Sequence, residues 1–231
     1  MSYRITGTGS CIPDITKKNS DFLKNKFLDI DGGKFQSSNS EIIDKFNSIT
    51  GIYERRYAPD EINSSDLAAV AAGIAINDSK LDQETLDYII VAHNTGDISC
   101  SSGQVDTLPS IASKVKAKLK IKNPNCVAYD IICGCPGWVE GIIQAKSFIK
   151  SGMAKKCLVI GCDTLSRILD ENDRDSMIYA DGSGAIVLES DSLYDGGILS
   201  HKSATFTYEG ENDYIFYGSS YDTNKRTKSD Q

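Results

Sequence analysis

The sequence predicts an α/β fold in which a mixed, mostly parallel sheet is covered by helices. The first observation is a series of short runs that are mostly apolar throughout, as is typical of strands buried on both faces. These runs lie at residues 3–7, 88–92, 127–132, 157–161, 185–189 and 198–200. The second observation is that helical segments separate most of the runs, which is the pattern of strands joined by helical crossovers.

Two segments, residues 65–77 and 136–151, carry a clear apolar stripe at helical spacing. The stripes are formed by Leu67, Val70, Ala71 and Ile74 in the first segment and by Val139, Ile142, Ile143 and Phe148 in the second. Pro136 stands in the first turn of the second segment, where its missing N–H costs nothing. Weaker signals predict helices at residues 39–49 and 109–119.

The composition is that of an ordinary globular protein. Of the 231 residues, 40% are hydrophobic and 25% are charged. No window approaches the roughly 18 consecutive apolar residues of a membrane span, and the N-terminal run lacks the apolar core of a signal peptide. We therefore expect a cytoplasmic protein with no membrane partner.

The charge argues against nucleic acid as a partner. The formal net charge is −7 and the pI is near 4.9, whereas phosphate contacts need a surplus of Lys and Arg. A local exception is residues 114–122, which carry five lysines. We interpret them as a solvated helix face, with attraction of an acidic carrier protein as the alternative.

The segment with most chemical information is residues 126–138 (CVAYDIICGCPGW), a buried strand that breaks at a Gly-Cys-Pro-Gly turn and continues as a helix. Such a turn lifts a side chain clear of the sheet and points the positive end of the helix at it, which favours a thiolate. The free N–H groups of the first helical turn can hold an oxyanion. We assign Cys135 as the nucleophile and a packing role to Cys133, which is predicted to lie on the strand.

The residues alone leave two other interpretations of this segment open. A cysteine at the end of a strand is commonly an inert member of the core. A Cys-x-Cys metal site is the other alternative, but no second Cys or His pair stands at suitable spacing to complete it, so we expect no metal. Since the number of cysteines is seven, an odd number, we also expect reduced thiols.

Six blocks resemble the β-ketoacyl-[acyl carrier protein] synthase III family in order and approximate spacing. They are residues 5–13 (ITGTGSCIP), 50–56 (TGIYERR), 129–137 (YDIICGCPG), 151–154 (SGMA), 159–163 (VIGCD) and 179–185 (YADGSGA). The resemblance covers about residues 3–208 and implies the N-terminal half of a thiolase-fold condensing enzyme. We therefore expect a thiolase-like N-terminal domain at residues 1–208, followed by a loop or tail at residues 209–231 that leads to a missing C-terminal half.

The resemblance implies an acyltransferase that carries out a decarboxylating Claisen condensation. Cys135 matches the position that accepts an acyl group from a thioester, and a malonyl-carrier-protein then loses CO₂ and attacks the acyl carbonyl. The implied donors are acyl thioesters of coenzyme A or of a carrier protein, without a further cofactor. Acyl carrier protein is the implied partner, and the implied assembly is a homodimer.

Three further residues are assigned to substrate binding from the resemblance. Arg174 matches an Arg that helps to hold the nucleotide of coenzyme A, with an ion pair to Asp170 or Asp173 on a solvated loop as the alternative. Thr50 belongs to the 50–56 block. Leu108 matches a bulky residue that crosses the dimer interface and limits the partner's acyl site, and a plain loop residue is its alternative.

The sequence departs from the family pattern just before residue 50. The Trp and Arg that flank the adenine in the family fall on Lys45 and Ile49. This departure favours a carrier-protein donor or an unusual primer over coenzyme A.

The family's catalytic His and Asn belong to the C-terminal half. His93 and His201 lie in segments that do not resemble the catalytic-His motif, and both are interpreted as surface or loop residues. We therefore expect a shortened or proteolysed enzyme, or a half that needs a separate partner. The alternatives are an acyl-transfer relative that does not decarboxylate and a non-catalytic condensing-enzyme-like subunit.

Overall fold

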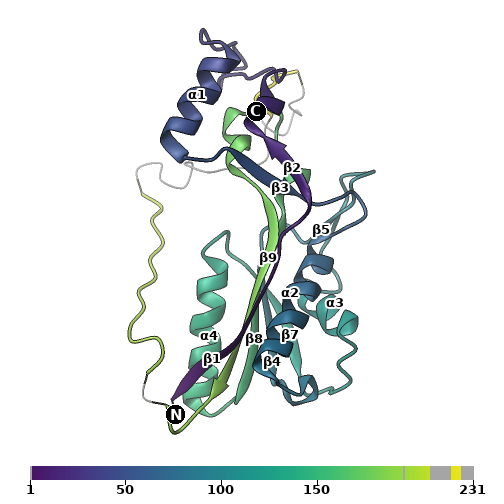
Figure 1. Ribbon diagram of the computed structural model, residues 1–231, viewed down its shortest axis with the longest axis vertical. Coiled ribbons are helices and arrows are strands. Elements are labelled where there is room, and N and C mark those ends of the chain that lie inside the picture. Colours follow the sequence, from purple (N-terminus) through teal and green to yellow (C-terminus); the bar gives the residue numbers. More distant parts are fainter. Residues whose placement is uncertain (1, 195, 209–219, 225–231) are drawn as a thin grey trace. The chain divides into compact units, whose positions relative to one another are not determined.

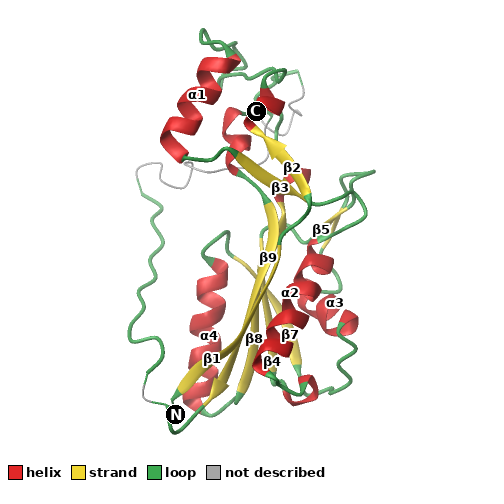
Figure 2. Cartoon of the chain, in the orientation of Figure 1, coloured by secondary structure: helices red, strands yellow, loops and turns green. Residues whose placement is uncertain are grey.

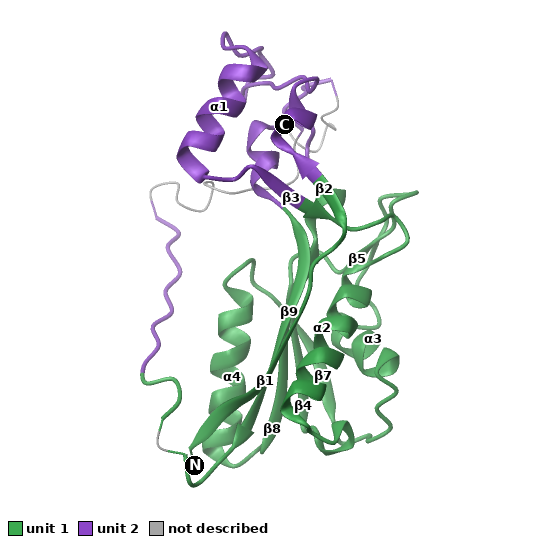
Figure 3. Cartoon of the chain, viewed as in Figure 1, with its two compact units in different colours: residues 1–16, 56–167, 180–199 green, residues 17–55, 168–179, 200–231 purple. Residues whose placement is uncertain are grey.

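The computed structural model describes residues 2–194, 196–208 and 220–224. Within them the chain forms two compact units, which Figure 3 shows in different colours. Unit 1 comprises residues 1–16, 56–167 and 180–199, and unit 2 comprises residues 17–55, 168–179 and 200–231. Most of the predicted tail, at residues 209–219 and 225–231, lies outside the described residues, so its boundary stays a prediction.

Unit 1 is built on a five-stranded sheet with the strand order β1-β9-β8-β4-β7. Its strands are β1 (Tyr3–Cys11), β4 (Tyr88–His93), β7 (Val127–Ile132), β8 (Lys156–Thr164) and β9 (Asp181–Ser190). β4 pairs in parallel with both β7 and β8, whereas β9 is antiparallel to β8 and to β1. Four strands therefore run in one direction and β9 runs against them, which confirms the mixed, mostly parallel sheet.

Helices cover both faces of this sheet. Figures 1 and 2 show α4 (Gly137–Ser151) on one face and α2 (Ser64–Ser79) with α3 (Ile111–Lys118) on the other. Alternation along β4 explains the two layers of core, since Ile89 packs in the cluster with α2 and α3 and the next residue, Ile90, packs with α4. The predicted α/β class is confirmed. A short hairpin, β5 (Asp97–Ile98) with β6 (Val105–Asp106), precedes α3.

Unit 2 has a small aromatic core of its own. Its elements include α1 (Asn39–Thr50) and the 3-10 helices η1 (Asn19–Phe22) and η4 (Arg174–Ile178). The core residues are Phe22, Phe27, Ile42, Ile43, Phe46 and Met177. Arg55 is buried with its Nε donating to the Met177 carbonyl at 3.0 Å and its guanidinium 5.0 Å from the centre of the Phe22 ring. The strands β2 (Ile15–Lys18) and β3 (Glu54–Tyr57) form a separate two-stranded sheet.

One predicted strand is wrong. Residues 198–200 are not assigned to a strand; instead, the Ile198 carbonyl accepts hydrogen bonds from the Tyr3 hydroxyl at 3.3 Å and from Lys146 Nζ at 3.2 Å. Side chains, rather than a neighbouring strand, therefore satisfy this backbone. The other five predicted strands and the four predicted helices are present, with ends shifted by up to four residues.

The predicted stripe on α2 is half wrong. Val70 and Ile74 are 50% and 46% exposed, and the face against the sheet carries small residues instead. The physical reason is the close approach of α2 to β1, where a Cβ placed on Gly9 would lie 2.2 Å from the Ala71 carbonyl oxygen. Bulky side chains do not fit between backbones at this distance, so alanines replace the expected stripe.

Within the described part of the chain, no helix combines the length and the apolar character needed to cross a membrane.

The contact between α2 and β1 gives a test of the fold. Gly9→Ala should lower the free energy of unfolding by about 3 kcal/mol, because its Cβ would collide with the backbone of α2. The matched control is Gly184→Ala on β9, where a Cβ would meet no atom within 4 Å; it should change stability by less than about 1 kcal/mol. Equal urea midpoints for the two variants would contradict the close packing.

Candidate active site

The candidate site lies at one edge of the sheet in unit 1. The neighbouring strands β8, β4 and β7 are parallel, so their carboxyl ends meet at the same edge, where α/β proteins commonly bind ligands. Asp163 lies near the end of β8, Asn94 follows β4, and Cys135 follows β7. Residues far apart in the sequence thus converge on one place.

The turn at Cys135 is built by the glycine and the proline around it. Gly134 has a φ of +64°, which favours glycine because other residues are strained there. Pro136 caps α4 with a φ of −65°, and the Gly137 N–H donates to the Gly134 carbonyl at 3.0 Å. Cys135 is exposed at the start of α4. The predicted strand–turn–helix is therefore present, with the cysteine at the positive end of the helix.

The predicted packing role of Cys133 is wrong. β7 ends at Ile132, whose ladder partner His93 ends β4, so Cys133 has already left the sheet. Ile132 is itself 68% exposed, and the Cys133 thiol is exposed as well. Because the chain bends at residues 133 and 134, it places two accessible thiols on either side of Gly134.

A cavity of about 280 Å³ adjoins Cys135. Its wall is made largely of small residues, which leave room for a substrate to approach the sulfur. The lining residues are Ala92, Gly134, Cys135, Trp138, Gly161, Cys162, Asp163, Leu165, Ala180, Gly182, Ser183 and Gly184. Gly182, Ser183 and Gly184 bring the first residues of β9 into this wall.

A partly buried carboxylate at the end of β8 holds the loop after β4 beside this cavity. Asp163 accepts hydrogen bonds from the Asn94 backbone N–H at 2.9 Å and from Asn94 Nδ2 at 2.6 Å. Burial raises the pKa of Asp163, and the two hydrogen bonds from Asn94 act in the opposite direction. A Cβ on Gly134 would lie 3.8 Å from Asn94 Oδ1, so the amide stands next to the turn that carries Cys135. Neither Asp163 nor Asn94 is among the predicted site residues. Their position at the carboxyl ends of parallel strands is the sequence feature that could have indicated them.

The prediction that His93 is a surface or loop residue is wrong. It is the last residue of β4 and is 1% exposed. The Gly96 N–H donates to its Nδ1 at 2.9 Å, so Nε2 carries the proton and donates to Asp130 Oδ2 at 2.9 Å. Asp130 also accepts from the Ile111 and Ala112 N–H groups at the start of α3. The imidazole is a structural link, and it does not line the Cys135 cavity.

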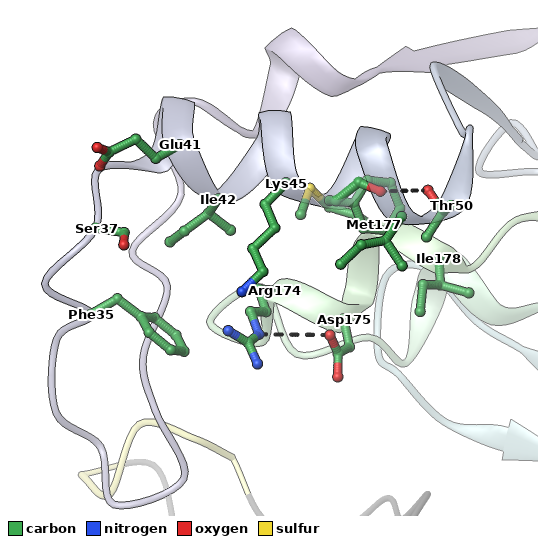
Figure 4. A pocket seen from close by; sticks show the side chains of 12 residues that line it. Phe35, Ser37, Glu41, Ile42, Lys45, Thr50, Arg174, Asp175, Met177 and Ile178 are labelled. Carbon is green, nitrogen blue, oxygen red and sulfur yellow. Dashed lines mark hydrogen bonds and ion pairs between the residues drawn. The ribbon is translucent and has the colours of Figure 1, made fainter.

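Arg174 and Thr50 meet in a second cavity, which lies within unit 2 and has a volume of about 380 Å³. Figure 4 shows Lys45 extending from α1 toward the Arg174 side of this cavity. The Arg174 guanidinium lies 4.8 Å from the centre of the Phe35 ring, and its Nε is 3.8 Å from Asp175 Oδ1. The ion pair is thus formed with Asp175, and not with the Asp170 or Asp173 of the alternative interpretation.

The Thr50 hydroxyl is already engaged by backbone. It donates to the Phe46 carbonyl at 2.8 Å and accepts from the Ile52 N–H at 3.1 Å, at the end of α1. Leu108, in unit 1, is 83% exposed and lines neither cavity. The roles of Thr50 and Leu108 in substrate binding stay predictions.

The lysines of α3 are not a free docking face. Lys114 pairs with Asp97 at 3.1 Å and with Asp106 at 2.9 Å, and Lys118 pairs with Asp66 at 2.7 Å. Lys116 Nζ donates to the carbonyls of Asn123 and Cys126, each at 2.7 Å. These three lysines bind neighbouring segments of unit 1, which corrects the interpretation of a solvated face. Among the described residues, no group of three His, Cys, Asp or Glu side chains could hold a metal ion.

Comparison with known proteins shows which proteins this fold resembles. The family model of 3-oxoacyl-[acyl-carrier-protein] synthase III matches residues 129–205. The solved structure of that synthase from Aquifex aeolicus VF5 is similar with a TM-score of 0.66 and 33% identity, over 83% of this chain and 55% of the other. The enzyme from Pseudomonas aeruginosa PAO1 gives a TM-score of 0.68 and 29% identity, over 87% and 54%. The thiolase-like fold is therefore confirmed.

Curated relatives name the family. β-Ketoacyl-[acyl-carrier-protein] synthase III from Neisseria gonorrhoeae is 39% identical over 192 residues, which is 82% of this chain and 53% of the relative. The protein of the same name from Ehrlichia ruminantium is 36% identical over 200 residues, 86% of this chain and 56% of the relative. The chain belongs to the β-ketoacyl-[acyl-carrier-protein] synthase III family, and it spans about half the length of these relatives.

The link through His93 can be tested by stability. His93→Ala should lower the free energy of unfolding by about 2–4 kcal/mol, because it leaves the buried Gly96 N–H without its acceptor. The exposed His201 is the control, and His201→Ala should cost less than about 0.5 kcal/mol. Chemical denaturation of both variants measures the difference, and a His93 variant as stable as the control would refute the structural role.

Proposed function

We propose that the protein accepts an acyl group on Cys135 as the first step of a β-ketoacyl synthase reaction. The observation that carries this proposal is an exposed thiol at the N-terminus of α4, facing a cavity walled by glycines. The Cys135 thiolate attacks the carbonyl carbon of an acyl thioester, the carbon–sulfur bond to the donor breaks, and the donor leaves as a thiol after taking up a proton. The first N–H groups of α4 supply donors for the transient oxyanion.

The second cavity, which lies within unit 2, suits a carrier group that bears phosphates. Its wall is mainly apolar and includes Ile42, Phe46 and Met177, and the cations Lys45 and Arg174 line it together with the acids Glu41 and Asp175. An apolar wall with two cations fits a group that combines a flat or aliphatic body with phosphates, as in coenzyme A or the phosphopantetheine of a carrier protein. We propose acyl thioesters of these two carriers as substrates.

The second step of the proposed reaction joins the acyl group to malonyl-carrier-protein. Loss of CO₂ from the malonyl group leaves an enolate, which attacks the Cys135 acyl carbonyl and releases the free thiolate. No histidine among the described residues lines the Cys135 cavity, and His93 is committed to Asp130. We therefore propose that the groups that polarise the malonyl thioester belong to the half of the relatives that this chain does not span, or to a partner chain. A homodimer with acyl carrier protein as its partner completes the proposal.

The acyl-enzyme step is tested with Cys135→Ala. Under reducing conditions, this variant should give no stable adduct with a panel of acyl-coenzyme A and acyl-carrier-protein thioesters, because it lacks the attacking sulfur. Cys133→Ala should still take up one acyl group, since Cys133 lies outside the cavity. Intact-mass spectrometry measures the adduct. An adduct that survives Cys135→Ala and is lost in Cys133→Ala would reverse the assignment.

Release of CO₂ from malonyl-carrier-protein separates the full synthase reaction from its alternatives. A non-decarboxylating acyltransferase would form the Cys135 adduct without releasing CO₂, and a non-catalytic subunit would form no adduct. Release of CO₂ is measured with this chain alone, and the full-length synthase III from Neisseria gonorrhoeae is the positive control.

The second cavity is tested through its cation. Arg174→Ala should raise the acyl-coenzyme A concentration that gives half-maximal acylation by about tenfold, the effect of losing one charge-assisted contact worth about 1.4 kcal/mol. The rate at which iodoacetamide alkylates Cys135 should not change. Arg4→Ala is the control, because Arg4 forms an exposed ion pair with Asp191 away from both cavities. An equal response of the Arg4 and Arg174 variants would remove this cavity from the proposal.

A further inference from the structure

We propose that Cys133 and Cys135 form a reversible disulfide when the protein meets a peroxide, which makes the pair an oxidative modification site. The acyl-transfer proposal uses Cys135 and leaves Cys133 without a task, although both thiols are exposed and free. The inference concerns the same sulfur as the proposed function, but its test detects a bond between two cysteines and needs no acyl transfer.

The backbone brings the two cysteines within bonding range. Two consecutive peptide units of about 3.8 Å each limit the Cα separation of residues 133 and 135 to about 7 Å, and a disulfide needs about 4.4–6.8 Å. The chain bends at residues 133 and 134, and Gly134 has a φ of +64°. Since a bend shortens the separation below its extended limit, the linkage requires rotation of side chains and a local adjustment, with no movement of the sheet.

The neighbourhood leaves room for that adjustment. A Cβ on Gly137 would lie 3.4 Å from the Cys133 Cβ, so the missing side chain at the start of α4 leaves space beside Cys133. Both residues follow the last ladder pair of β7 and precede the first residue of α4. A bond formed here therefore breaks none of the hydrogen bonds of the sheet.

The other thiols are poorer targets. Cys126, Cys157 and Cys162 are buried and Cys11 is partly buried, and burial raises the pKa of all four. A buried, protonated thiol reacts slowly with peroxide, because the thiolate is the nucleophile. Cys100 is exposed, but it lies more than thirty residues from the turn in sequence and lines neither cavity.

The chemistry proceeds in two balanced steps. The Cys135 thiolate attacks a hydroperoxide, the O–O bond breaks, and Cys135 becomes a sulfenic acid as hydroxide or an alkoxide leaves and takes up a proton from water. The Cys133 thiol then attacks the Cys135 sulfur, the S–O bond breaks, and water leaves with the Cys133 proton. The two sulfurs lose two electrons in all, and the peroxide gains them. Because the ring closed by the bond is small and exposed, the disulfide is readily reduced by thiols.

The consequence is protection of the nucleophile. The disulfide blocks acylation for as long as it persists, and it keeps Cys135 from the irreversible sulfinic and sulfonic acids. A reductant restores the free thiol.

Mass spectrometry of peroxide-treated protein tests the proposal. The wild-type chain, titrated with hydrogen peroxide, should lose about 2 Da, peptide mapping should place the link between residues 133 and 135, and dithiothreitol should reverse it. Cys133→Ser should instead gain about 32 or 48 Da on Cys135, without recovery in dithiothreitol. Cys100→Ser is the matched control and should behave as wild type.

Two outcomes overturn the proposal. One is irreversible oxidation of wild-type Cys135 at the same rate as in Cys133→Ser. The other is a disulfide that links Cys135 to a different cysteine or to a second chain. Acylation assayed separately in dithiothreitol reports on the proposed function, so a failure of either proposal is recognised by itself.

Discussion

The close packing of α4 on the central sheet is the constraint on which the candidate site depends. A Cβ on Gly141 would lie 2.9 Å from Val159 Cγ1, and one on Gly137 would lie 3.2 Å from the Ala92 Cβ. These glycines let the helix axis lie close to β4 and β8. The first turn of α4 is thereby held beside the carboxyl ends of the strands, and the thiol of Cys135 stands at the positive end of a helix that cannot shift without breaking the core.

Buried and partly buried polar residues around the turn complete this arrangement. Asp163 binds Asn94, whose side chain adjoins Gly134, while His93 and Asp130 connect β4 and β7 to the start of α3. Each of these groups has hydrogen-bond partners, as buried polar groups must. They position the site, whereas the cysteine and the small residues beside it carry the proposed chemistry. The bend at residues 133 and 134 places Cys135 in the wall of the cavity and leaves Cys133 outside it.

The sequence was sufficient for most of the elements and for the turn that carries Cys135, because their signals are local. Apolar runs reveal strands buried on both faces, and the Gly-Cys-Pro-Gly turn reveals the break between β7 and α4. The α2 stripe could not be predicted, since the distance between α2 and β1 is set by Gly7 and Gly9, which lie more than fifty residues away. The spacing of apolar residues along α2 does not indicate which side of the helix packs against Gly7 and Gly9 of β1.

Burial of His93 was also beyond the sequence, because its partner Asp130 becomes a neighbour only when β4 and β7 pair. Cys133 was misplaced for the opposite reason. Cys133 continues an apolar run, but the hydrogen-bonded ladder of β7 ends one residue earlier, at Ile132. The apolar pattern does not indicate where the ladder ends. The pairing of Arg174 with the Phe35 ring likewise depends on a contact between segments about 140 residues apart.

The measurement that tests the central claim most directly is tandem mass spectrometry of the unaltered chain after incubation with acyl thioesters in the presence of a reductant. The account predicts a single acyl group, located on the peptide that contains the turn from β7 to α4 and assigned by its fragments to the Cys135 sulfur. An acyl group on any other residue, or a chain that remains unmodified by every donor, would contradict it.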